Sequence, residues 1–134
     1  MNVIVDTPIW SLVLRREKPN TKLQSIFSKL LEEGRIVLPG IIKQELLSGI
    51  KNKTQFNSLS EKLIHFPEVL ASGTDHILAA TFFNDCQKSG IQGSHIDFLI
   101  VAIAINNSVS IFTSDKDFKH YRKHIPFELQ LFEI

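Results

Sequence analysis

The chain has 134 residues, of which 43% are hydrophobic and 22% are charged, and its formal net charge is +1. These values are typical of one compact globular domain over residues 1–134, and they exclude a disordered or fibrous chain. The longest wholly apolar run, residues 98–105, is too short to span a bilayer, and Met1 leads into a strand-like run rather than a secretory signal. We therefore expect no membrane association and a cytoplasmic location, with which the single Cys86 agrees.

Strand-like and helix-like patterns alternate through the N-terminal half. Short apolar runs rich in β-branched residues predict strands, and apolar residues three or four apart predict helices. Pro8 suits the first turn of a helix, and Gly34 is a typical helix stop. The expected elements, in chain order, are a strand over residues 2–5, a helix from Pro8, a helix over residues 23–31, a strand over residues 35–38, a turn at Pro39–Gly40 and a helix over residues 41–49.

The C-terminal half continues this alternation. The apolar run over residues 98–105 fits a buried strand or a buried helix, and we favour a helix because Ser94 and Asp97 resemble a capping box. The expected elements are a helix ending before Pro67, a helix capped by Thr74–Asp75 and running to Lys88, a helix over residues 97–106, a strand over residues 110–113, a short helix over residues 116–124 and a strand over residues 128–132. This order predicts a three-layer α/β/α fold with a central, mainly parallel sheet.

Four carboxylates stand where such a fold would bring them to one edge of the sheet. Asp6 and Asp115 follow predicted strands, and ligands bind at the carboxyl ends of strands in open α/β sheets. Glu45 lies on the apolar stripe of its helix, where an unpaired Glu is rare, and Asp97 begins the apolar helix. Two unit charges about 5 Å apart repel by roughly 3 kcal/mol at an effective dielectric constant near 20, so a cation must offset them. Oxygen ligands without clustered Cys or His select Mg²⁺ or Mn²⁺.

Several of these residues also have a purely structural interpretation. Asp6 could cap the helix from Pro8, Asp97 could be the acid of the capping box, and Asp115 could be a turn residue. Asp117 could cap the last short helix or support the site from behind. Lys and Arg gather in residues 15–18, 51–53 and 116–123, where solvated surface and phosphate contact are equally good explanations. His120 and His124 are four apart, but the Glu of a zinc-protease helix is missing, so we expect surface histidines.

The segments around the four acids resemble the motifs of the PIN-domain family, and within it the VapC-type toxins of toxin–antitoxin pairs. The resemblance covers essentially the whole chain, in the order Val5–Ser11, Ile41–Glu45, Ile96–Ala104 and Phe112–Phe118. It implies an endoribonuclease that cleaves RNA with Mg²⁺ or Mn²⁺, acts as the toxin of a pair, is held inactive by a cognate antitoxin and forms a homodimer. One departure is Pro8, which stands where the family often has a small polar residue and which affects helix geometry rather than chemistry.

The resemblance also assigns roles to the residues. Asp6, Asp97 and Asp115 would bind the metal, and Glu45 would bind it directly or through water and orient the nucleophile. The supporting residues would be Thr7, Thr113 and Asp117. Two other functions stay open: a non-catalytic PIN-like module that binds RNA or protein, and an aspartate-dependent phosphatase, which usually needs a second Asp where this chain has Pro8.

A partner surface is expected on the first helix. Trp10, Leu12, Val13 and Leu14 offer more apolar positions than one buried stripe can use, which is typical of an interface. This surface would serve an antitoxin or a second copy of the chain.

Overall fold

Five short parallel strands form the centre of the fold. They are β1 (Val3–Val5), β2 (Ile36–Pro39), β3 (Glu68–Val69), β4 (Ser110–Thr113) and β5 (Leu129–Leu131). Their order in the sheet is β3-β2-β1-β4-β5, and every neighbouring pair is parallel. In the central pair, Val3 stands opposite Ser110 and Val5 opposite Phe112. The computed structural model, which describes residues 1–134, therefore confirms the predicted parallel sheet.

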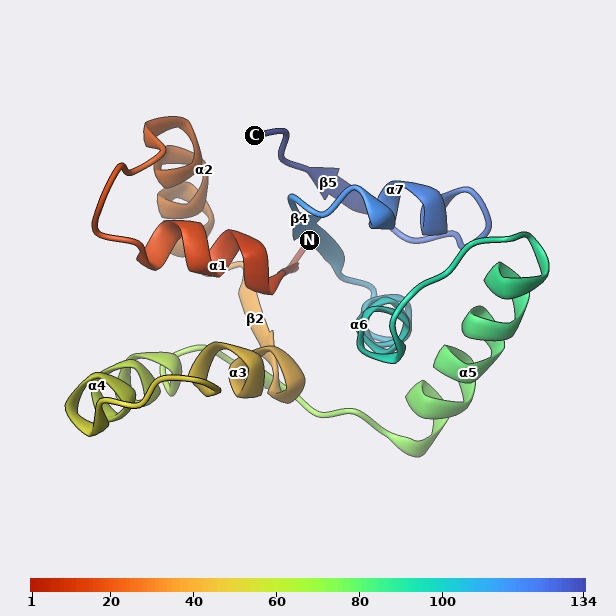
Figure 1. Cartoon of the computed structure of the whole chain (residues 1–134), viewed down its shortest axis with the longest axis horizontal. Coiled ribbons are helices and arrows are strands. Elements are labelled where there is room, and N and C mark those ends of the chain that lie inside the picture. Colours follow the sequence, from red (N-terminus) through yellow and green to blue (C-terminus); the bar gives the residue numbers. More distant parts are fainter.

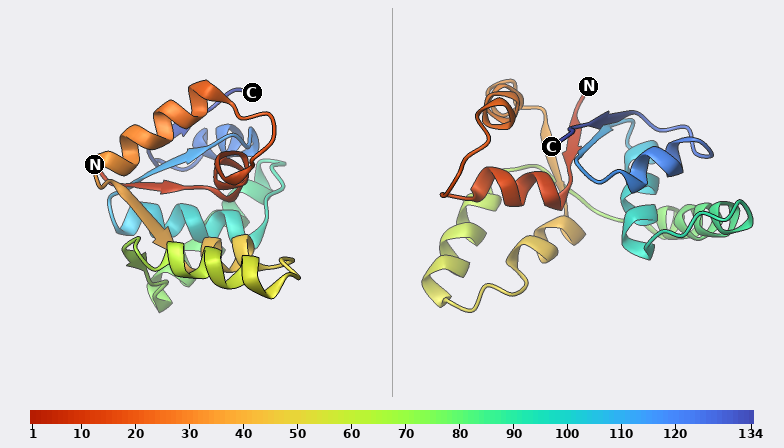
Figure 2. Two further views of the ribbon diagram at one scale, coloured as in Figure 1. Left: turned by 90° about the vertical axis from the view of Figure 1, so that its left-hand side faces the viewer. Right: turned by 45° about the horizontal axis from the view of Figure 1, so that its top comes forward.

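Seven helices cover the two faces of this sheet. They are α1 (Thr7–Leu14), α2 (Thr21–Glu32), α3 (Gly40–Leu47), α4 (Lys53–Leu63), α5 (Gly73–Lys88), α6 (His95–Asn106) and α7 (Asp117–Arg122). Parallel neighbours need crossover connections, and these place α1 to α4 on one side of the sheet and α5 to α7 on the other (Figure 1; Figure 2, right). The three-layer α/β/α prediction is confirmed. None of the helices combines the length and apolar character that crossing a bilayer requires.

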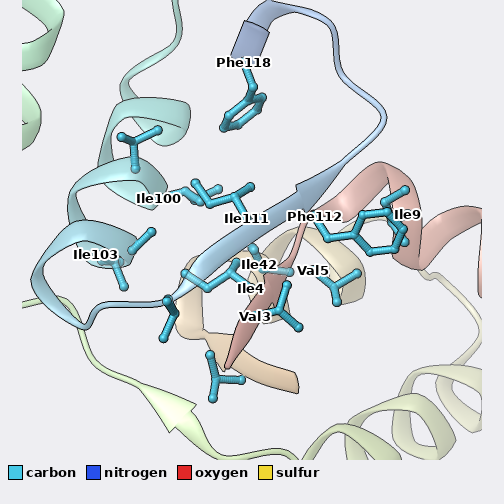
Figure 3. Packing of buried hydrophobic residues seen from close by; sticks show 14 of the residues in the cluster. Val3, Ile4, Val5, Ile9, Ile42, Ile100, Ile103, Ile111, Phe112 and Phe118 are labelled. Atoms are coloured by element: carbon cyan, nitrogen blue, oxygen red, sulfur yellow. The ribbon is translucent and has the colours of Figure 1, made fainter. Parts of the chain in front are cut away.

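The strands have continuous apolar sequences because helices cover both faces of the sheet. All three residues of β1 are fully buried. Successive side chains of a strand point to opposite faces, so Ile111 of β4 faces Ile100 of α6, whereas Phe112 faces Ile9 of α1 (Figure 3). The buried apolar residues form one continuous cluster that extends into both helical layers.

The prediction that Trp10 belongs to an exposed apolar surface is wrong. Trp10 is only 3% exposed, and its ring packs edge-on against Phe27 and Phe66, with centroid distances of 5.2 and 5.1 Å. The reason is that α2 and the segment after α4 both close over α1. Of the four predicted residues only Leu14 remains exposed, at 42%.

Three further boundaries differ from the sequence prediction. Pro39 ends β2 and Gly40 begins α3 directly, so there is no separate turn. Gly49 lies beyond the end of α3 with φ of +87°, a conformation that glycine adopts without steric cost. Ser72, rather than Thr74–Asp75, caps α5, and it forms a complete capping box with Asp75. The edge strand β3 was not predicted, since two residues are too few for a pattern.

Candidate active site at the edge of the sheet

The centre of the sheet contains the point where its topology reverses. From β1 the chain moves outward to β2 and β3, and it then returns to add β4 and β5 on the other side of β1. In open α/β sheets, ligands bind outside the carboxyl ends of the two strands at this switch point. Asp6 directly follows β1, and its backbone N–H donates to the carbonyl of Phe112 in β4. Asp115 follows β4 by two residues, so both predicted acids lie at this edge.

Asp6 is the most buried of the four acids, at 5% exposure. Its Oδ1 accepts a hydrogen bond from the backbone N–H of Thr7 at 2.9 Å, so Asp6 does cap α1. Its Oδ2 accepts a hydrogen bond from the Thr113 hydroxyl at 2.7 Å. The Thr113 oxygen in turn accepts from the backbone N–H of Asp115 at 3.0 Å. Thr113 is fully buried. Its two hydrogen bonds join the segments that carry Asp6 and Asp115.

Glu45 reaches the site from α3, which lies in the same helical layer as α1. Its neighbours Ile42 and Leu46 are buried, which confirms that Glu45 lies beside the apolar stripe of α3. The hydroxyl of Thr7, on α1, donates to Glu45 Oε1 at 3.0 Å. The residue following Asp6 thus holds Glu45, and this side-chain contact ties α1 to α3.

Asp97 stands in the first turn of α6. Ser94 caps the helix by accepting the backbone N–H of Asp97 at 3.0 Å, but the backbone N–H of Ser94 does not donate to the Asp97 carboxylate in return. The predicted capping box is therefore only half formed. The Asp97 carboxylate instead accepts a hydrogen bond from the hydroxyl of Tyr121 on α7, with 2.8 Å between the oxygens.

Asp115 and Asp117 begin the short helix α7. Asp115 Oδ1 accepts the backbone N–H of Asp117 at 2.9 Å, so Asp115 also has the local turn role that its sequence context suggested. Asp117 is exposed in the first turn of α7, where a negative charge is favoured by the helix dipole.

Electrostatic repulsion links the acids to one another. Burial raises the pKa of Asp6 to about 6; the hydrogen bonds from Thr113 and Thr7 oppose this effect, and the charges of Asp97 and Glu45 add to it. Burial also raises the pKa of Asp97, against the hydrogen bond from Tyr121 and together with repulsion by Asp115 and Asp117.

No positive side chain offsets these charges. The ion pair between Arg35 and Glu33, at 3.3 Å, is the only salt bridge in the structure, and it lies away from the four acids in the fold. The cluster therefore carries several carboxylates, two of which have raised pKa values, with no Lys or Arg bound to them.

The donor set fits a hard divalent cation, although the side chains do not converge on one point. No three of the Asp, Glu, His or Cys side chains lie close enough to share an ion as they stand. The hydroxyls of Thr7, Thr113 and Tyr121 each hold one of the carboxylates by a hydrogen bond. Mg²⁺ keeps several water molecules when it binds proteins, so its ligands need not all touch the ion.

Sequence reasoning missed Tyr121. Its segment was predicted to be a short helix with basic side chains and two surface histidines, and Tyr121 had no role in that prediction. The available signal was the spacing of Phe118 and Tyr121, which are three residues apart, like two residues on one helical face, and are both buried. A buried Tyr hydroxyl usually finds a hydrogen-bond partner, and here the partner is a predicted site residue.

Comparison with known proteins gives a family and a fold. The PIN domain family model matches residues 3–124. The chain is similar to the structure of VapBC2 from Rickettsia felis bound to a DNA fragment from their promoter (20% identity, TM-score 0.79, 99% of this chain and 100% of that chain). It is also similar to VapBC-1 from nontypeable Haemophilus influenzae (20%, 0.79, 98% of each chain) and to a toxin–antitoxin complex from Klebsiella pneumoniae (18%, 0.75, 99% and 100%).

No curated relative matches the chain. At these identities the similar structures establish the fold, and the family model, which spans most of the chain, establishes the family. The chain belongs to the PIN-domain family.

Proposed function

We propose that this chain is a divalent-metal-dependent endoribonuclease and the toxin of a toxin–antitoxin pair. The observation that carries the proposal is that Asp97 and Glu45 lie near enough to Asp6, at the switch point of the sheet, for their charges to raise its pKa, while no cationic side chain is bound to any of the three. PIN-domain membership and the similarity to structures of toxin–antitoxin complexes support the same function.

In the proposed site, carboxylates bind the metal and hydroxyl groups hold the carboxylates in place. Asp6, Asp97 and Asp115 would hold Mg²⁺ or Mn²⁺, directly or through water. A divalent ion bound there would activate a water molecule and stabilise negative charge on the phosphoryl and leaving oxygens. Glu45 Oε1 is held by Thr7, which leaves Oε2 to orient the attacking water and accept its proton.

Basic residues beside the acids offer contacts for RNA phosphates. Lys116, Lys119 and Lys123 are exposed on α7 and at its ends, in the same segment as Asp115 and Asp117. Lys side chains at such positions neutralise backbone phosphates without reading the sequence. They would hold the RNA while the acids act on one phosphodiester bond.

The proposed partners are a cognate antitoxin and a second copy of the chain. An antitoxin that placed an Arg or Lys among the acids would offset their charge in competition with the metal and stop cleavage without unfolding the protein. The exposed apolar residue of α1 is Leu14, which lines a hollow of about 430 Å³ with Ile50, Leu59 and five polar or charged residues. Either partner would contact α1 at this hollow.

The test is cleavage of RNA by the purified protein with Mg²⁺ or Mn²⁺ and with excess chelator. We expect cleavage that requires the metal, is lost in Asp6→Asn and is suppressed by the product of a neighbouring reading frame. Undiminished cleavage in chelator would exclude the metal mechanism. RNA binding without cleavage at any metal concentration would indicate a non-catalytic module, and turnover of a phosphomonoester alone would indicate a phosphatase.

A further inference from the structure

The uncharged hydroxyl of Tyr121 donates one hydrogen bond to a carboxylate of the acidic cluster. Tyr121 lies on α7, is only 1% exposed, and donates its hydroxyl to Asp97 Oδ2 across 24 residues of sequence. The bond commits one of the two carboxylate oxygens of Asp97 and restricts rotation of its carboxylate.

Close packing fixes the position of the Tyr121 ring. The ring lies tilted against Phe98, with 4.8 Å between centroids, and edge-on to Phe118, with 5.3 Å between centroids. On a third side it approaches Gly93, where an added Cβ would stand 2.8 Å from Tyr121 Cε1 and 2.6 Å from Phe98 Cζ. Real Cβ atoms do not come so close to other atoms. The two rings can pack against this backbone because residue 93 is a glycine and has no Cβ. The ring of Tyr121 is therefore packed between α6, its own helix α7 and the loop at Gly93.

The chemical character of the donor suits a site that must bind a cation. An Arg or Lys in this place would hold Asp97 equally well, but its charge would offset the carboxylates and compete with the metal. A phenol orients the carboxylate without adding positive charge. A phenol has an ordinary pKa of about 10, so the hydroxyl is a donor at neutral pH.

We propose that Tyr121 is a positioning residue, which limits the orientations open to the Asp97 carboxylate and thereby favours its binding of the divalent ion. The inference rests on the proposed function, because it assigns Asp97 to the metal. It adds a residue that the four acidic segments do not contain.

The experiment compares Mn²⁺ binding by the intact protein and by Tyr121→Phe, measured by calorimetry without RNA. The Phe variant keeps the ring and its packing and removes only the hydroxyl. Loss of a group that orients a metal ligand typically weakens binding about 10- to 100-fold, and we expect a value near the lower limit because water can replace the hydroxyl at the half-buried Asp97. In the RNA assay, more Mn²⁺ should restore the rate, and KM for RNA should not change.

Two controls separate positioning from a general loss of stability. In an Asp97→Asn background, Tyr121→Phe should leave the residual Mn²⁺ affinity unchanged, because the hydroxyl acts through the carboxylate. Asn106→Ala removes a comparable donor to a carboxylate, the 2.6 Å bond from Asn106 to Asp75 between α6 and α5. This variant should lower the unfolding temperature without altering Mn²⁺ affinity.

Three results would overturn the proposal: unchanged Mn²⁺ affinity in Tyr121→Phe, an equal loss of affinity in the Asp97→Asn background, or a lower unfolding temperature as the sole effect. If the unaltered protein binds no Mn²⁺, the positioning role fails together with the metal site. If it binds Mn²⁺ and Tyr121→Phe weakens that binding, but no RNA is cleaved, the proposed function fails and the positioning role stands.

Discussion

Asp6→Asn should make the metal-free protein more stable and the enzyme inactive. Most substitutions of buried residues destabilise a protein, so opposite effects on stability and activity would identify a residue kept for function. Asp6 suits this test because it is almost fully buried and faces the charges of Asp97 and Glu45 with no cation beside it.

The size of the stabilisation follows from the pKa of Asp6. Its pKa rises from the ordinary value of 3.8 to about 6, and each tenfold change in an equilibrium is worth about 1.4 kcal/mol, so the ionised side chain costs on the order of 3 kcal/mol at neutral pH. Asparagine removes the charge, but its single amide oxygen cannot accept from both the Thr7 N–H and the Thr113 hydroxyl, as the two carboxylate oxygens do. One lost hydrogen bond is worth about 1 kcal/mol, which leaves a net gain of about 1 to 2 kcal/mol.

The gain in unfolding free energy of Asp6→Asn should increase with pH. Below pH 3.8 Asp6 is protonated in both the folded and the unfolded chain, so its charge costs nothing. Between pH 3.8 and about 6 only the folded chain holds the proton, and the cost of ionisation grows through this window. Above about pH 6 Asp6 is ionised in both states and the cost is complete. The advantage of Asp6→Asn should therefore be largest at pH 7 and vanish towards pH 4.

Denaturant unfolding in chelator at several pH values measures this difference. Adding Mn²⁺ should then reverse the order, because metal binding stabilises only the protein that keeps the carboxylate. If Asp6→Asn is destabilising at pH 7, or if its gain is the same at pH 4 and pH 7, the charge repulsion inferred for the cluster is wrong.

Further substitutions test the acids, the cap of α5 and the RNA contact separately. Glu45→Gln should lower the single-turnover rate about 10- to 100-fold, and Asp97→Asn should lower it more; an unaffected rate in Glu45→Gln would remove that residue from the site. Asp75 has a pKa below 3.8, because the hydrogen bonds of its capping box and from α6 outweigh its burial, so its contribution is complete above pH 3.8 and is lost at lower pH. Asp75→Asn should therefore cost about 1 to 2 kcal/mol of unfolding free energy at pH 7 and progressively less below pH 3.8, and an effect independent of pH would contradict this. Lys119→Ala should raise KM for RNA, leave kcat unchanged and reduce the salt slope by about 1, whereas Lys29→Ala on α2 should change none of them; equal effects of the two would exclude a local contact.

Sequence reasoning placed the elements that carry the acids because each depends on a local pattern. The β-branched run before Asp6 and the run before Asp115 predicted two strands, and β1 and β4 lie where these runs are. The apolar stripe around Glu45 predicted a helix with an acid beside its buried face, and α3 has this form. The metal itself and the roles of the acids remain predictions.

Contacts between segments that are distant in the sequence could not be predicted from local patterns. Periodicity shows which face of an element is buried but not what covers it, so Trp10 was assigned to a surface that Phe27 and Phe66 in fact close. The same limit explains why the contact between Thr7 and Glu45, 38 residues apart, and the contact from Tyr121 to Asp97 were not foreseen.

The insertion of β4 beside β1 has a consequence for how the protein is made. Thr113 and Asp6 are 107 residues apart, so the buried hydrogen bond between them closes nearly the whole chain into one loop. Contacts of such high sequence separation form late in folding, because the entropy of loop closure must be overcome first. During synthesis, β1, β2 and their helices leave the ribosome long before Asp97 and Asp115. Under the proposed function, a nascent chain would therefore lack two of its four acids until the last part of the chain has been made.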